Sequence, residues 1–141
     1  MRGEAYALLD LDYLSWAGTG RSDRAAELGL MLENLKAVAA NYRRAGIQRF
    51  VLAYFVRDAG EVRGVQAALS LPLRVVRLTV PLAAIEQRLA ADVTSGRQDD
   101  LRAAAAQLAA AEGAGIEDVA IGNDRPIAAV AHEVMAFLRW L

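Results

Sequence analysis

Two carboxylates two residues apart, Asp10 and Asp12, stand at the end of the apolar run AYALLDL. If this run is a strand, the alternation of its side chains sends both carboxylates to the same side of the chain. There they could hold Mg²⁺ through water or accept a proton from a hydroxyl group. The structural alternative is that Asp12 caps a turn while Asp10 binds loop amides. The spacing alone leaves both interpretations open.

Further polar groups follow the later apolar runs, and the carboxyl ends of parallel strands are where functional groups collect. Asn123, Asp124 and Arg125 come after the last of these runs. Arg88 and Arg97 flank the segment AADVTSGRQDD, where two guanidinium groups could clamp a phosphoryl group. The alternative for these arginines is a solvated position at a helix end.

The composition excludes several kinds of site. The chain of 141 residues has no cysteine and a single histidine, which excludes a disulfide scaffold, a zinc-thiolate site and a His-rich metal site. Lys and Arg number 16 against 17 Asp and Glu, and this balance argues against a nucleic acid as the main partner. No signal peptide or uncharged run of about 18 residues is present, so we expect no membrane association and a soluble, cytoplasmic protein.

Apolar runs without alternation predict four strands, near residues 5–11, 49–56, 73–80 and 118–122. Between and after them, helical spacing and capping signals predict helices over 23–45, 59–69, 82–96, 101–112 and 127–141. Ser22 is the predicted cap of the first helix and Gly46 its terminator, and Asp58 with Glu61 has capping-box spacing. This alternation predicts one α/β domain over 1–141, with a mainly parallel sheet in a three-layer α/β/α arrangement.

The order of these pieces resembles bacterial P-loop small-molecule kinases over nearly the whole chain. The similarity is carried by a strand ending in D-x-D-x-L and by the segments VVRLTVPLAAIEQRLAADVTSGRQDDL and EDVAIGNDRPIAAVAHEVMAFLRWL. Within this group, the order of segments resembles that of actinobacterial P-loop ATPases related to shikimate, gluconate and adenylylsulfate kinases. The resemblance implies ATP and Mg²⁺ as cofactors and a small-molecule acceptor as substrate.

The resemblance also implies roles for particular residues. Asp10 and Asp12 match the segment that contacts the acceptor or the magnesium shell. Arg88 matches the first arginine of the lid over the γ-phosphate, and Arg97 is a displaced candidate for the second. The loop matching the one that borders the adenine consists of Asn123, Asp124, Arg125 and Pro126.

One part of the family pattern is missing from the 141 residues. They contain no G-x-x-x-x-G-K-[ST] loop, and the only lysine, Lys36, lies within a predicted helix. The resemblance implies the strand order 2-3-1-4-5, and the match starts at strand 2. A gap of about two strand spacings, roughly 10 Å, would then separate strands 3 and 4. We expect a longer protein, a sheet that closes up, or another chain at the gap, and therefore predict a homodimer.

Three functions stay open on this evidence. The first is a kinase-like protein, inactive or incomplete in these residues, whose complete form transfers phosphoryl groups from ATP to a small hydroxylated acceptor. The second is a non-catalytic member of the same superfamily that serves in binding or assembly. The third is a metal-dependent ribonuclease of the PIN or NYN type, with Asp10, Asp12 and the GND of residues 122–124 as its acidic set.

Overall fold

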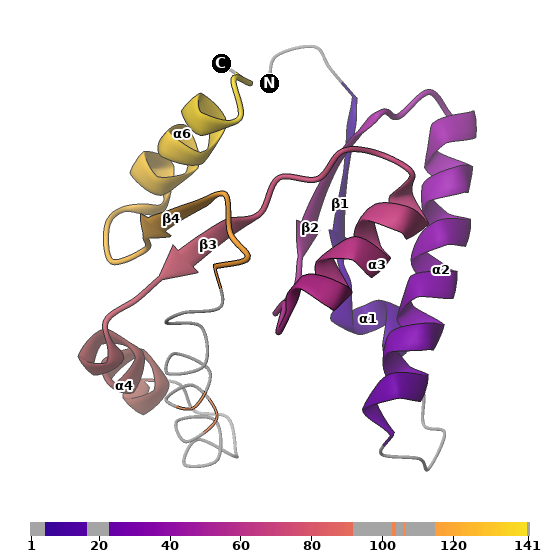
Figure 1. Ribbon diagram of the computed structural model, residues 1–141. Coiled ribbons are helices and arrows are strands. Elements are labelled where there is room, and N and C mark those ends of the chain that lie inside the picture. The colour runs from indigo at the N-terminus through magenta and orange to yellow at the C-terminus, as the bar shows by residue number, and fades with distance from the viewer. Residues whose placement is uncertain (1–4, 17–22, 92–102, 104–105, 107–114, 141) are drawn as a thin grey trace. The chain divides into compact units, whose positions relative to one another are not determined.

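The computed structural model describes residues 5–16, 23–91, 103, 106 and 115–140 (Figure 1). The chain divides into two compact units, residues 1–73 and 74–141, which are taken one at a time below. Each unit combines helices with one small parallel sheet of two strands. Among the described residues, no helix is long and apolar enough to cross a membrane.

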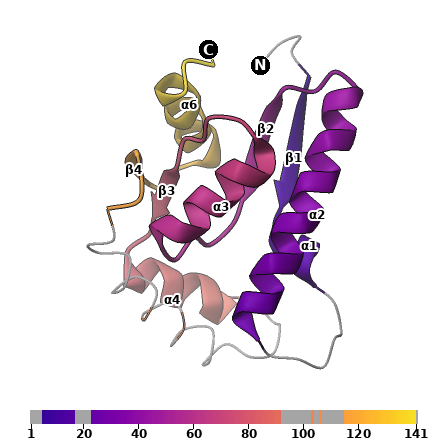
Figure 2. The same ribbon diagram turned by 45° about the vertical axis from the view of Figure 1, so that its right-hand side comes forward.

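The first unit is built on two parallel strands, β1 (Tyr6–Asp10) and β2 (Arg49–Ala53). Their register pairs Tyr6 with Arg49 and Asp10 with Ala53. Three helices complete the unit: α1 (Asp12–Ser15), α2 (Arg24–Arg44) and α3 (Ala59–Leu69). Figure 2 shows α2 and α3 beside the two strands, with α1 directly after β1.

One face of this sheet is covered and the other is exposed. The alternation of side chains turns Leu9 and Leu52 toward the core, where they pack against buried residues of α2 and α3. On the opposite face Tyr6 is 48% exposed and Leu8 is 68% exposed. The buried residues of the core, all at most 8% exposed, are Leu11, Met31, Leu35, Ala39, Val65, Ala68 and Leu69.

Local capping explains where α2 begins and ends. The N-cap is Asp23, whose side chain accepts the Ala25 N–H at 3.0 Å, so the prediction of Ser22 as the cap was wrong by one residue. Aspartate satisfies the free amides of the first turn as well as serine does. The predicted terminator is confirmed, because Gly46 has a left-handed φ of +87° and its N–H binds the Arg43 carbonyl at 2.9 Å.

The predicted cap of α3 is also confirmed. The Asp58 side chain accepts the N–H groups of Gly60 at 2.7 Å and of Glu61 at 3.0 Å. The helix closes at Ser70, whose φ of 51° is left-handed and therefore costly for a residue with a side chain.

The second unit contains β3 (Val76–Thr79), α4 (Leu82–Ala91), β4 (Val119–Gly122) and α6 (Ile127–Phe137). The strands β3 and β4 are parallel. Ile121 of β4 and Val130 of α6 are buried, and α6 contacts β4. The predicted helix over 101–112 lies outside the described residues, apart from 103 and 106.

The last helix is shorter than predicted. It was expected to run to residue 141, but α6 ends at Phe137 because Arg139 takes a left-handed φ of 55°. The Trp140 N–H then donates to the Met135 carbonyl at 2.9 Å, and the Arg139 N–H to the Ala136 carbonyl at 3.1 Å. This pair of bonds is a Schellman motif, which closes the helix.

The prediction of four parallel strands in a mixed α/β protein is confirmed, but the strands are shorter than expected. The strand β2 stops at Ala53 rather than residue 56. Its last main-chain bond to the β1 segment is donated by the Leu11 N–H to Ala53 O at 3.0 Å, because the chain turns away after Leu11. The strands also form two separate two-stranded sheets rather than one continuous sheet.

Candidate functional site

The chain turns sharply at the carboxyl end of β1, where the predicted carboxylates lie. Leu11 has helical φ and ψ of −74° and −20°, so that Asp12 is the first residue of α1. The Asp12 N–H donates to Asp10 Oδ1 at 3.1 Å. The expectation that the two side chains leave an extended chain in one direction was therefore wrong, because a helix begins between them. Both carboxylates are exposed.

A hydrogen bond from α2 anchors the short helix α1. Asn34 Nδ2 donates to the Leu14 carbonyl at 2.6 Å, which satisfies one of the free carbonyl groups of a single-turn helix. The same helix presents two exposed rings, Tyr13 and Trp16, whose centroids are 5.6 Å apart. The carboxylate pair is therefore next to an aromatic pair on an anchored turn.

A cluster of three polar side chains, Arg24, Tyr54 and Glu61, joins α2, the end of β2 and α3. Arg24 Nη2 donates to Glu61 Oε1 at 2.7 Å and to the Tyr54 hydroxyl at 2.7 Å. The other carboxylate oxygen, Glu61 Oε2, accepts the Arg57 N–H at 3.0 Å. Glu61 is only 6% exposed, and these bonds satisfy both oxygens of its buried carboxylate.

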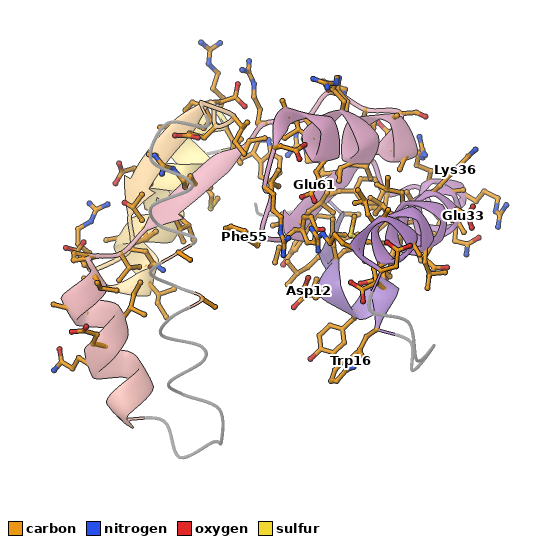
Figure 3. The ribbon with its side chains drawn as sticks, turned by 60° about the horizontal axis from the view of Figure 1, so that its bottom comes forward. Asp12, Trp16, Glu33, Lys36, Phe55 and Glu61 are labelled. Carbon is orange, nitrogen blue, oxygen red and sulfur yellow. The ribbon has the colours of Figure 1, made fainter. Side chains whose placement is uncertain are left out.

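The electrostatics of this cluster also involve Asp12. Burial raises the pKa of Tyr54, and the negative charges of Glu61 and Asp12 raise it further, against the opposing effect of Arg24. Asp12 therefore lies within electrostatic reach of the Tyr54 hydroxyl. The hydrogen bond to Glu61 raises the pKa of Arg24, so its guanidinium stays charged. Figure 3 labels Asp12, Glu61 and Phe55 in this part of the first unit.

This arrangement can bind hydroxyl groups. Among the described residues neither Asp10 nor Asp12 has a cationic partner, and Arg24 is paired with Glu61. Free carboxylate oxygens accept hydrogen bonds from hydroxyl groups and can take up their protons. The described residues contain no group of three or more side chains suited to a metal ion. A magnesium ion at Asp10 and Asp12 would need ligand or water oxygens for its remaining positions.

The four residues predicted to border the adenine form the loop between β4 and α6 in the second unit. The Asn123 N–H donates to the Thr79 carbonyl at 2.7 Å. Arg125 Nη2 binds the Gly122 carbonyl at 3.2 Å and Glu133 Oε2 at 2.5 Å, and this ion pair raises the pKa of Arg125. The remaining two residues are Asp124, which is exposed, and Pro126, which is the N-cap of α6.

The two predicted lid arginines are only partly described. Arg88 lies on α4, and its side chain is not among the described ones. Arg97 lies outside the described residues. Asp10 and Asp12 belong to the first unit, whereas Arg88 and the loop of residues 123–126 belong to the second.

Sequence reasoning did not identify the cluster of Arg24, Tyr54 and Glu61. Glu61 was interpreted only as a member of a capping box, although its side chain binds the Arg57 N–H rather than that of Asp58. A signal for it was present, since Glu61 stands in line with Val65 and Leu69 on the buried stripe of α3. A carboxylate in such a stripe requires a buried partner.

No family model matches the chain, and neither a curated protein nor a solved structure does. The observation with the most chemical content is the pair of exposed aspartates at the end of β1.

Proposed function

We propose that the protein is kinase-like and binds a small hydroxylated molecule at the carboxyl ends of β1 and β2. The observation that carries this proposal is that Asp10 and Asp12 are exposed and have no cationic partner among the described residues, while Arg24 is paired with Glu61. Their resemblance to the acceptor-binding segment of P-loop kinases supports the same role. In a complete enzyme, the carboxylate of Asp12 would accept the proton of the hydroxyl that attacks the phosphoryl group.

The buried carboxylate of Glu61 has a defined part in this proposal. Glu61 is 6% exposed and binds the Arg24 guanidinium at 2.7 Å, so the positive charge of Arg24 is already paired within the cluster. Arg24 and Glu61 are thus positioning residues, while Asp10 and Asp12 would touch the ligand.

The phosphoryl donor in this proposal is ATP with Mg²⁺. The loop of Asn123, Asp124, Arg125 and Pro126 would border the adenine, and Arg88 and Arg97 would approach the γ-phosphate in a three-layer P-loop arrangement. The 141 residues contain no loop of the G-x-x-x-x-G-K-[ST] type, whose amides and lysine supply most of the affinity for the phosphates. We therefore expect these residues to bind the acceptor but to bind ATP weakly or not at all.

A second candidate is a non-catalytic binding or assembly protein, and one observation favours it. Among the described residues, the strand β2 has a neighbour on one side only, and a strand edge of this kind can accept another polypeptide. The ribonuclease alternative has less support, because its metal ions need more carboxylates than one pair. The part of the chain that is described has no group of three metal-binding side chains.

Nuclear magnetic resonance titration of the ¹⁵N-labelled chain with sugars and sugar alcohols tests the proposal. We expect shifts of the Asp10 and Asp12 amide signals and a loss of affinity of at least about tenfold in Asp12→Asn, equivalent to about 1.4 kcal/mol. Glu33→Gln is the matched control, since Glu33 is an exposed carboxylate on the outer side of α2 (Figure 3). Equal affinity in both variants, or no shift at Asp10 and Asp12 with any compound, would contradict the proposal.

The nucleotide expectation has its own test, which does not depend on the acceptor. Isothermal titration calorimetry of the chain with Mg²⁺–ATP should show no binding in the low micromolar range. Tight binding would mean that other residues form a phosphate site. In that case Arg125→Met would show whether the loop of residues 123–126 contributes.

A further inference from the structure

The open edge of β2 can be described residue by residue. In a parallel ladder, alternate residues direct both their N–H and C=O groups to the same neighbour. Leu11 N–H binds Ala53 O at 3.0 Å, so Val51 and Ala53 face β1. The main-chain groups of the alternate strand residues, Phe50 and Leu52, therefore point away from β1, and Tyr54, directly after the strand, is next in the same alternation. Among the described residues, no strand pairs with them.

The segment that forms this edge lacks the residues that usually protect an edge strand from pairing. Natural edge strands carry lysine, proline, a bulge or an inward charge, which discourage the addition of another strand. The segment from Arg49 to Phe55 reads RFVLAYF, with no proline, no lysine and a single charge at its start. Its register with β1 is continuous, without a bulge. The edge is therefore suited to accept an apolar strand.

We propose that the partner at this edge is a second copy of the same chain, with the two β2 strands antiparallel about a two-fold axis at Leu52. In an antiparallel pair, residues that direct their main-chain groups outward must face one another. Centring the axis on Leu52 uses all three outward residues of each copy. Phe50 then lies opposite Tyr54 of the partner subunit, and Leu52 opposite Leu52 of the partner subunit.

The side chains of β2 are self-complementary in this register. A two-fold axis perpendicular to the sheet keeps the helix-covered faces of both copies on one side, so the aromatic pairs join two existing cores. On the other face, Arg49 lies opposite Phe55 of the partner subunit. Phe55 is 38% exposed. No two like charges face each other directly along the pairing.

Hydrogen exchange of the unmodified chain gives a residue-specific test. In the dimer, the amides of Phe50, Leu52 and Tyr54 donate across the interface, whereas those of Val51 and Ala53 donate to β1 in either state. We expect exchange of the first three amides to slow by at least about tenfold as the protein concentration rises through the dissociation constant. Val51 and Ala53 should exchange slowly at every concentration. Light scattering should show the mass of two chains over the same range.

Two substitutions on the exposed face of the sheet distinguish dimerisation through the edge of β2 from dimerisation through the sheet face. Val51→Lys places a charge beside the open edge, and Leu8→Lys places the same charge on β1, next to Val51 in the register but one strand further from the edge. We expect only Val51→Lys to weaken dimerisation, by at least about tenfold. Equal weakening by both variants would overturn the proposed pairing, because it would assign the interface to the sheet face.

Other outcomes also overturn the proposal. A mass of one chain at all concentrations, with fast exchange of the three amides, would show that the edge stays open. Slow exchange of the same amides in a protein with the mass of one chain would show that another segment of this chain covers the edge. Slow exchange only in the presence of a different polypeptide would assign the edge to that polypeptide.

Discussion

Replacement of Arg24 by methionine should destabilise the first unit strongly, because it leaves the carboxylate of Glu61 buried without a countercharge. Methionine keeps much of the unbranched apolar stem of arginine and removes only the guanidinium. The variant loses two hydrogen bonds of 2.7 Å, to Glu61 and to Tyr54. Among the described residues, Glu61 then retains one hydrogen-bond donor, the Arg57 N–H.

The expected magnitude follows from these contacts. A hydrogen bond to a charged group contributes about 1.5–3 kcal/mol, and the lower part of this range applies because the Arg24 side chain is 40% exposed to water. The bond to Tyr54 adds about 1 kcal/mol. The unfolding free energy of Arg24→Met should therefore fall by about 3 kcal/mol, which agrees with the cost of breaking a buried ion pair.

A double-mutant cycle with Glu61→Gln separates the ion pair from lost packing. Glu61→Gln alone should cost about 1.5 kcal/mol, since water can solvate the half-exposed Arg24. The double variant has no buried charge and should be more stable than the sum of both changes predicts, by about 1.5 kcal/mol. Arg63→Met, on the exposed side of α3, is the control and should change stability by less than about 0.5 kcal/mol.

The assay is native-state hydrogen exchange of the amides of α2 and β2, resolved by nuclear magnetic resonance. These amides report the unfolding free energy of the first unit alone, which matters because two units need not unfold together. A loss of less than about 0.5 kcal/mol in Arg24→Met, or strict additivity in the double variant, would refute the argument that Glu61 depends on Arg24.

Three further predictions concern single contacts. The hydrogen bond from the Val75 N–H lowers the pKa of Asp118, so this group stabilises the folded state above about pH 4. The stabilisation is lost as the pH falls through the lowered pKa. Asp118→Asn should therefore flatten the acid limb of the plot of stability against pH, and an unchanged limb would contradict this. Ser70→Gly should raise the melting temperature, gaining about 1 kcal/mol because φ is 51°, and a decrease would show that the serine side chain matters more. Asn34→Ala should cost about 1 kcal/mol by freeing the Leu14 carbonyl, and faster amide exchange confined to α1 would verify the cause.

The secondary structure could largely be predicted because local signals determine it. Unbroken apolar runs identified four strands, and Asp58 and Gly46 marked helix ends through main-chain hydrogen bonds that depend only on neighbouring residues. The turn at Leu11 could not be predicted, because it depends on Asn34 of α2 holding α1 at Leu14. Pairing of the strands into two sheets is likewise a property of contacts between distant segments.

The candidate site shows the same division between local and distant information. Asp10 and Asp12 were identified because a strand end with two carboxylates is a local pattern. Arg24 and Glu61 are 37 residues apart, and their partnership arises only when α2 and α3 pack together. A buried-stripe position for Glu61 indicated that some partner was needed, but the sequence did not indicate which one.

The pairing of strands in both units has a consequence for the order of folding. Tyr6 pairs with Arg49 and Val76 with Val119, so each ladder joins residues 43 positions apart in the chain (49 − 6 and 119 − 76). Neither ladder can form its first bond until a long loop has closed, which costs entropy before any contact compensates. In the first unit α2 lies within that loop, and its 21 helical residues shorten the flexible chain that must be closed. Substitutions that weaken α2 on its exposed side should therefore slow folding more than they accelerate unfolding.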